Sequence, residues 1–212
     1  MGKIFKDASV LFIITLVAGI LLGLVYQVTK EPIAAQNEKA KQEAYETVLS
    51  SASKFEVIYS EENADDVAYL SSLLEESTTD FSKDDISEVV KGTDNGETVG
   101  YVITVTAHDG YAGDIKFSVG LSSEGEYLGT SILSISETAG LGMRAKTDPS
   151  FLNQFKGATT TEFSLVTDGT GSESGDAIVD AISGSTVTSK AMTKAINAAL
   201  VVFETINEGG NN

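Results

Sequence analysis

The sequence predicts an α+β protein with one membrane-spanning helix ahead of its folded part. Three observations lead to this expectation. Residues 8–28 carry no charge, residues 97–135 alternate apolar with polar or small side chains, and residues 186–206 repeat apolar side chains at helical spacing. Strands that are grouped along the chain and followed by helices are typical of an antiparallel sheet packed with helices.

The first apolar segment is long enough to cross a bilayer. About 20 apolar residues, rising about 1.5 Å each, match the hydrocarbon core, and Tyr26 suits the interface at the far end. A cleavable signal peptide has a shorter apolar region and a small-residue cleavage site. The nearest candidate, Ile33–Ala35, lies beyond two charged residues. We therefore expect residues 1–30 to be a short N-terminus and an uncleaved anchor.

The next segment, residues 31–95, is predicted to be helical and acidic. Apolar residues recur at helical spacing from Glu31 to Ser50, and residues 67–74 predict a second, short helix. Pro32 fits either the first turn of a helix or a break after the membrane helix. The acidic side chains concentrate between Glu56 and Asp114, which is typical of a solvated face. Collection of cations by this acidic segment is the functional alternative.

Residues 96–212 are predicted to form the functional domain. Three strands with period-two alternation come first, and the turn between the last two makes them a hairpin. The strands are expected at 99–105, 115–121 and 127–135, followed by a short helix at 151–155, a short strand at 163–166, a mobile polar loop at 172–175 and a helix at 186–206.

Composition excludes several classes of function. The net charge of −17 disfavours binding to nucleic acid or to an anionic lipid surface. The absence of cysteine excludes disulfides, thiolate metal sites and iron–sulfur clusters. One histidine, His108, precedes Asp109 and Gly110 and is interpreted as a turn residue. We therefore predict neither a metal site nor a catalytic residue.

The segment Asp180–Thr186 is the strongest candidate for a binding site. It leads directly into the last predicted helix, and a helix N-terminus carries unpaired N–H groups and a partial positive charge that favour phosphate. Hydroxyl groups surround that point and a glycine lets the backbone approach a ligand. These residues are Ser183, Gly184, Ser185, Thr186 and Thr188. A Ser/Thr-rich helix cap is the structural alternative.

The same segment resembles the motif that flavin transferase recognises, Asp-x-x-Ser/Thr-Gly-Ala/Ser-Thr. The resemblance implies that FMN is attached to Thr186 through a phosphoester, and that the modifying enzyme reads Asp180. Ser185 stands where the family usually has alanine, which adds a competing hydroxyl.

Two further segments resemble the FMN-binding domain family, in the order that the family has. The loop Glu137–Gly142 is similar to a Glu-Thr-Pro-Gly-Leu-Gly loop, with Ala139 in place of proline, and Gly110–Gly113 is similar to a Gly-Tyr-x-Gly strand start. The resemblance covers about residues 95 to 205. It implies that the loop lies by the flavin ring, through Glu137, Thr138, Gly140, Leu141 and Gly142. A tight turn after a strand is the alternative.

Together with its apolar N-terminus, the whole chain resembles the G subunits of Rnf electron-transport complexes, which are related to the C subunit of the sodium-translocating NADH:quinone reductase. The resemblance implies an electron-carrier subunit of an ion-pumping complex rather than an enzyme alone. Its implied partners are other membrane subunits and, for maturation, flavin transferase. The domain would lie on the extracytoplasmic face of the cell membrane. The alternatives are the FMN-binding domain of another extracytoplasmic reductase or quinone-reductase complex, and a cofactor-free acidic surface protein.

Overall fold

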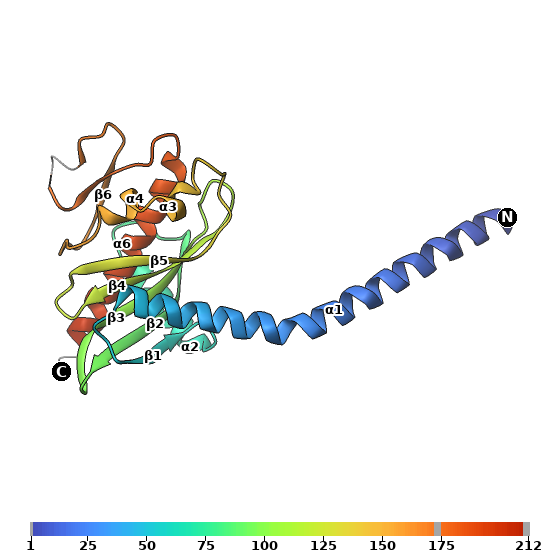
Figure 1. Cartoon of the computed structure of the whole chain (residues 1–212), viewed down its shortest axis with the longest axis horizontal. Coiled ribbons are helices and arrows are strands. Elements are labelled where there is room, and N and C mark those ends of the chain that lie inside the picture. Colours follow the sequence, from blue (N-terminus) through green and yellow to red (C-terminus); the bar gives the residue numbers. More distant parts are fainter. Residues whose placement is uncertain (1, 172–174, 210–212) are drawn as a thin grey trace. The chain divides into compact units, whose positions relative to one another are not determined.

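The computed structural model describes residues 2–171 and 175–209, and it confirms an α+β fold (Figure 1). Five antiparallel strands form one sheet in the order β1-β2-β3-β4-β5, and β6 pairs with β7 in parallel. The elements are α1 Gly2–Val48, β1 Lys54–Ser60, α2 Ala64–Glu75, β2 Asp84–Asp94, β3 Glu97–Ala107, β4 Ile115–Ser122, β5 Tyr127–Ile135, α3 Arg144–Thr147, α4 Ser150–Asn153, β6 Ser164–Val166, β7 Ile178–Asp180 and α6 Thr186–Gly209.

Helix α1 contains the uncharged segment and is long and apolar enough to cross a membrane. It runs through Pro32, so the expectation of a helix start or a break at that residue was wrong. A proline removes one helical hydrogen bond, and here the helix continues on both sides of it. The chain divides into two compact units, residues 1–42 and 43–212, so the last six residues of α1 belong to the second unit.

Residues 51–95 contribute two strands as well as the short helix that the sequence predicted. Helix α2 is that short helix, but β1 and β2 pair with each other and β2 pairs with β3. The predicted boundary between residues 95 and 96 falls in the turn that joins β2 to β3. The pairing of β2 with β3 shifts register between Ile86 and Glu88, which interrupts the period-two alternation of the strand. The expectation of a helical acidic segment at residues 31–95 is corrected accordingly, because it contains β1 and β2 as well.

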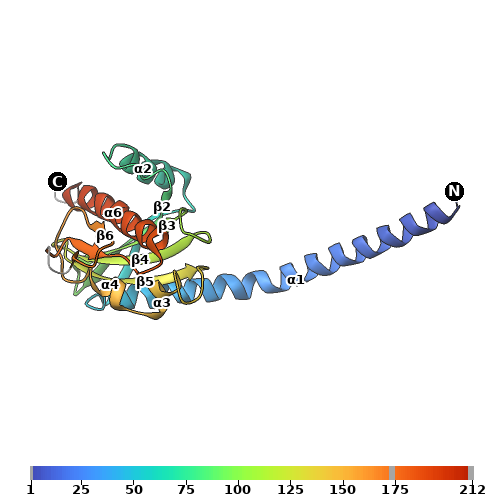
Figure 2. The same cartoon turned by 90° about the horizontal axis from the view of Figure 1, so that it is seen from above.

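Both faces of the five-stranded sheet are covered, at least in part. Helices α2 and α6 lie on one side (Figure 2), where α6 contributes buried residues such as Met192 and Ile196 to the main core. On the other side Tyr45, Val48 and Leu49 pack against Val90 and Val102. Apolar burial of this kind contributes about 1.5–3 kcal/mol for each large side chain. The sheet is therefore fixed from both sides, and the loops at its end are held in place.

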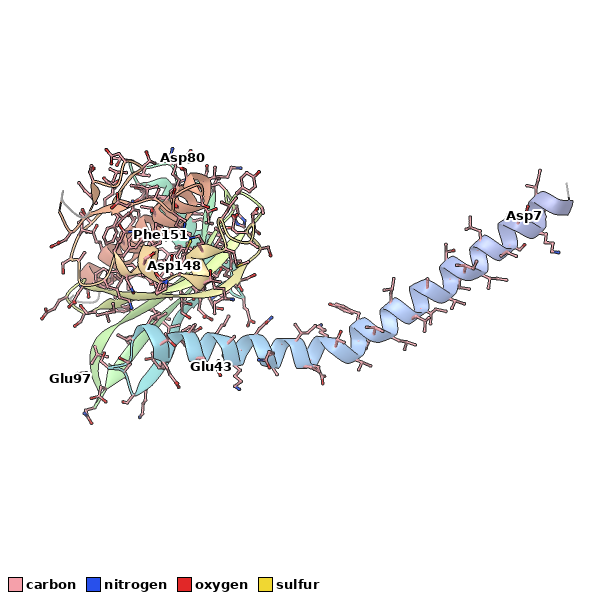
Figure 3. All side chains as sticks on the ribbon, turned by 45° about the horizontal axis from the view of Figure 1, so that its top comes forward. Asp7, Glu43, Asp80, Glu97, Asp148 and Phe151 are labelled. Atoms are coloured by element: carbon pink, nitrogen blue, oxygen red, sulfur yellow. The ribbon has the colours of Figure 1, made fainter. Side chains whose placement is uncertain are left out.

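An aromatic cluster supports the chain between α4 and β6. Phe151, labelled in Figure 3, makes an edge contact with Phe155, and the Phe155 and Phe163 ring centroids are 4.9 Å apart. Tyr127 on β5 contacts Phe155 and Phe163. The cluster anchors β6, and through the pairing of β6 with β7 it anchors the segment that leads to α6. Part of the predicted polar loop, residues 172–174, lies outside the described residues.

Candidate functional site

The chain enters α6 through a tight turn that is held from inside. Gly184 has a φ of +79°, which favours glycine. The Ser185 N–H donates to the Ile182 carbonyl at 2.8 Å, and Ser189 Oγ bonds both the Ile182 N–H and the Ser185 carbonyl at 2.9 Å. The first helical hydrogen bond runs from the Ser189 N–H to the Ser185 carbonyl. The N–H groups of the three residues before Ser189 therefore have no partner within the helix.

A pocket of about 440 Å³ lies at this helix start. Three segments form it: the beginning of α6, the loop after β5, and the tip of the loop between β3 and β4. Its lining residues are Tyr111, Glu137, Thr138, Leu141, Gly142, Gly184, Ser185, Thr186, Val187 and Thr188. Segments that are separated by 26 and 42 positions, at residues 111, 137–142 and 184–188, thus meet around one space.

Eight of the ten residues that the sequence indicated as cofactor contacts line this pocket. The other two, Ser183 and Gly140, are exposed and lie in the flanking turns, where Gly140 has a φ of +75°. Sequence reasoning missed two lining residues. Tyr111 belongs to the Gly-Tyr-x-Gly segment, and Val187 follows Thr186 in the first helical turn. Both residues lie in or beside motifs that the sequence did indicate, and this position in the chain could have marked them as pocket residues.

Glu137 joins two of the three segments. Its Oε1 accepts hydrogen bonds from the Tyr111 N–H at 2.7 Å and from the Ala112 N–H at 3.4 Å. Its Oε2 is buried and has no hydrogen-bond partner among the described residues. A buried carboxylate oxygen without a partner is costly. This oxygen therefore marks a place where a ligand or ordered water would be favourable.

Gly142 keeps the space beside Glu137 open. A Cβ at this position would lie 2.6 Å from Glu137 Oε2 and 2.5 Å from Thr188 Oγ1, so no larger residue fits without displacement. The requirement here is for space rather than for a special backbone angle, because Gly142 is not among the residues with positive φ. The second glycine of the loop is thus needed to bring the loop close to α6.

The hydroxyl groups at the helix start differ in accessibility. Ser185 Oγ is buried and has no hydrogen-bond partner among the described residues, and Thr188 is also buried. Thr186 is half-buried and lines the pocket. The rim is apolar, with Tyr111, Leu141 and Val187 exposed by 70%, 44% and 48%. Among the pocket hydroxyls at the helix start, that of Thr186 therefore belongs to the residue most open to a modifying enzyme.

Asp180 lies outside the pocket and is part of the supporting structure. Its Oδ1 accepts a hydrogen bond from the Gly171 N–H at 3.0 Å. Its backbone N–H donates to Gln154 Oε1 at 2.7 Å, and Gln154 Nε2 donates to the Asp180 carbonyl at 3.1 Å. In the folded chain this aspartate therefore fixes the path of β7 into the turn before α6.

A helix start that favours phosphate and a close glycine loop line one pocket, which defines a candidate phosphate-binding site. Residues 110–201 match the FMN-binding domain family, and residues 1–48 match the RnfG N-terminal region. The chain belongs to the family of G subunits of ion-translocating oxidoreductase (Rnf) complexes, as its relatives also show.

The similar proteins span nearly the whole chain. The G subunit of the Na⁺-translocating ferredoxin:NAD⁺ oxidoreductase complex of Acetobacterium woodii is 34% identical over 97% of this chain and 94% of its own length. The G subunit of the proton-translocating ferredoxin:NAD⁺ oxidoreductase complex of Clostridium ljungdahlii is 28% identical over 98% and 96%. The corresponding G subunit of the ion-translocating oxidoreductase complex of Methanosarcina acetivorans is 30% identical over 93% of each chain.

Proposed function

We propose that this chain carries FMN joined to Thr186 Oγ1 through a phosphoester and relays electrons as a membrane-anchored subunit of an ion-translocating redox complex. The observation that carries the proposal is the place of Thr186. Thr186 is half-buried, lies in the first turn of α6 and lines the pocket together with the loop 137–142. The match to the FMN-binding domain family supports the choice of cofactor.

The residues of the pocket fit such a group. The first N–H groups of α6 favour a phosphate oxygen. Ser185 Oγ and Glu137 Oε2, which have no partner among the described residues, mark unmet hydrogen-bonding capacity beside it. Gly142 leaves the space that a flat ring needs next to the loop. The apolar rim of Tyr111, Leu141 and Val187 suits the hydrocarbon part of the ring.

The chain's own part is to hold and orient the cofactor. Bound FMN supplies one- and two-electron transfer, so the protein contributes position and electrostatics rather than acid–base chemistry. An ester at Thr186 fixes the phosphate end at the helix start. Leu141 and Tyr111, from two segments, would border the ring, and Glu137 places a carboxylate within the pocket.

Attachment requires an activated flavin, because joining a free phosphate to an alcohol in water is unfavourable. A flavin dinucleotide is suitable: the Thr186 Oγ1–phosphorus bond forms, the pyrophosphate bond breaks, the nucleoside monophosphate leaves and the hydroxyl proton is released. We propose flavin transferase as the enzyme for this step, since the segment Asp180–Thr186 resembles its recognition motif.

Flavin fluorescence of the denatured chain tests the proposal. The full chain is expressed with and without flavin transferase and separated under denaturing conditions, and its intact mass is measured. We expect a fluorescent band and a mass increase equal to one FMN phosphoester only with the transferase. A dark band, in cells where the transferase labels a second substrate, would contradict the proposal and favour a cofactor-free surface protein.

We further propose that residues 8–28 anchor the chain and that the domain lies on the extracytoplasmic face. Because the chain has no cysteine, single cysteines report the topology. A membrane-impermeant maleimide applied to intact cells is expected to label Ser123→Cys in the domain and not Lys6→Cys before the span. Labelling of Lys6→Cys alone would reverse the orientation. The experiment does not depend on flavin.

Replacing Glu137 by glutamine is expected to raise the midpoint potential of the flavin, on the order of tens of millivolts, because a carboxylate in the pocket opposes added negative charge. Glutamine keeps the acceptor for the Tyr111 N–H, so the loop is preserved. Redox titration of the attached flavin measures the effect. Glu124→Gln, in the exposed turn before β5, makes the same charge change as a control. An unchanged potential in Glu137→Gln would refute this role.

A further inference from the structure

The loop between β3 and β4, residues 108–114, connects the pocket to a charged cluster at the end of the sheet. Its tip, Tyr111, lines the pocket and is 70% exposed. The loop is joined to the segment after β5 by Glu137, whose side chain accepts the two hydrogen bonds from the Tyr111 and Ala112 N–H groups. At Gly110 a Cβ would lie 2.9 Å from Glu137 Oε1, so this contact is close. The position of Tyr111 therefore depends on what holds the loop at its base.

The base of the loop is closed by the only histidine of the chain. His108 Nε2 lies 2.8 Å from Asp85 Oδ2 on β2, and His108 Nδ1 lies 2.9 Å from Asp114 Oδ1 just before β4. An ionised carboxylate accepts hydrogen bonds and cannot donate them. Both ring nitrogens must therefore carry a proton to bond both aspartates at once, which describes the imidazolium form.

Other charged groups lie near this ring, while the two aspartates that it bonds set the direction of its titration. From β2, Asp84 is buried and pairs with Lys194 of α6 at 3.2 Å, and Asp109 of the loop lies 4.0 Å from the same lysine. Glu61, which lines a neighbouring cavity with His108, pairs with Lys116 of β4. Hydrogen bonds first to Asp114 and then to Asp85 raise the pKa of His108 above its ordinary 6.5.

His108 and Asp84 both make the stability of this region depend on pH. Because the folded pKa of His108 is raised, its contribution to loop stability is complete below about pH 6.5 and is lost as the pH rises through the raised value. Burial raises the pKa of Asp84 to about 6, so the stability that its protonated form contributes is lost as the pH rises from 3.8 to about 6. The two groups therefore act in different pH windows, and the window at higher pH belongs to His108.

We propose that the imidazolium form of His108 is a positioning device for the pocket: by bonding Asp85 and Asp114 it holds the loop 108–114, with Tyr111, at the pocket wall. Loss of one ring proton breaks one of the two bonds and loosens the loop. The consequence for flavin rests on the proposed function, because only then does the loop border a bound cofactor. The response of the loop itself is independent of flavin.

The loop response is measured first in the full chain made without flavin transferase. The chain has no tryptophan and one histidine, so Tyr111→Trp gives a single fluorescent probe at the exposed tip, and histidine NMR signals report His108 alone if the purification tag contains no histidine. We expect iodide quenching of the tryptophan to rise with the same midpoint at which His108 loses its proton. A titrating histidine with a constant tryptophan signal would overturn the proposal.

Variants separate positioning from a general effect on folding. In Asp114→Asn and Asp85→Asn the His108 midpoint is expected to shift to lower pH, and the quenching midpoint to shift with it. Asp94→Asn, at the other end of β2, makes the same charge change and should leave both midpoints in place. In His108→Gln the pH dependence of tryptophan quenching above about pH 6, where Asp84 titrates, is expected to be lost. The tryptophan should then be as open to iodide as in the parent chain at a pH above its His108 midpoint. If the quenching midpoint persists in His108→Gln, the role of His108 is overturned.

The flavin consequence is measured in the full chain with attached FMN, without the tryptophan. Iodide quenching of flavin fluorescence is expected to rise through the His108 midpoint and to become pH-independent in His108→Gln. If flavin is attached and its quenching does not change across the His108 midpoint, the loop does not cover the cofactor. The proposed consequence for flavin is then refuted. If no flavin is attached, the proposed function fails, while the tryptophan experiment still decides on the loop.

Discussion

Replacing Thr186 by alanine is expected to abolish covalent flavin, whereas Ser185→Ala should retain it. The physical reason is access: Ser185 Oγ is buried behind the turn, and Thr186 lies half-buried at the pocket. An enzyme that delivers an activated phosphate needs an approach to the attacking oxygen. Thr186→Ser keeps a hydroxyl at the same helix position, primary instead of secondary, and should retain flavin. In-gel fluorescence and peptide mass measure all three variants, with the parent chain as reference.

The reverse pattern would be equally informative. Fluorescence that persists in Thr186→Ala and disappears in Ser185→Ala would move the ester to Ser185 and require the turn at Gly184 to open during modification. Loss in both variants, with unchanged thermal unfolding, would show that the two hydroxyls act together. Only retention in Ser185→Ala combined with loss in Thr186→Ala supports the assignment to Thr186.

Asp180 illustrates how one residue serves in a motif and in the fold. Its carboxylate accepts from the Gly171 N–H, and Gln154 bonds both of its backbone groups. Removing that side chain leaves the Gly171 N–H without its partner and loosens the path into α6. Reduced flavin attachment in an Asp180 variant would therefore combine two effects, the proposed recognition by the transferase and the support of the turn. Stability must be measured beside attachment before either effect is assigned.

The sequence predicted the elements whose side-chain pattern is regular. The strands around Ile103, Phe117 and Ile132 alternate clearly, and the apolar spacing of α6 begins at the residue that the motif indicated. Strands β1 and β2 escaped prediction because β1 is half-exposed and because register shifts interrupt both its pairing with β2 and that of β2 with β3. Local periodicity does not report pairing between distant segments.

In the candidate site, too, the sequence indicated local segments but not the contacts between distant ones. Motif similarity indicated the segments around Glu137 and Thr186, and the structure brings both to one pocket. The buried state of Ser185 and the bonds from Glu137 to the loop at Tyr111 depend on contacts across the fold. The same is true of the two aspartates at His108, of which one lies on a strand that the sequence did not indicate. Residue types identify candidates, and long-range packing decides their roles.

Three glycines on adjacent strands make room for the end of α1 and the residue after it. A Cβ at Gly92 would lie 2.3 Å from Leu49 Cδ2, and one at Gly100 would lie 2.9 Å from Leu49 Cδ1. At Gly120 a Cβ would lie 2.2 Å from the Val48 carbonyl oxygen and 2.8 Å from Val48 Cβ. Backbone atoms cannot move aside as the end of a flexible side chain does. The contact at Gly120 is therefore the least tolerant of the contacts that these glycines make with Val48 and Leu49.

Gly120→Ala is accordingly expected to destabilise residues 43–212 by at least about 1–3 kcal/mol, the usual cost of forcing extra volume into a packed core. Gly129 is the matched control, because it pairs directly with Gly120 across β4 and β5. A Cβ at Gly129 would meet only the Lys156 side chain, at 3.4 Å, so Gly129→Ala should be nearly neutral. Urea unfolding of the full chain in detergent, followed by the near-ultraviolet circular dichroism of its tyrosines, measures both. Equal midpoints for the two variants would show that Val48 does not pack on the sheet in solution.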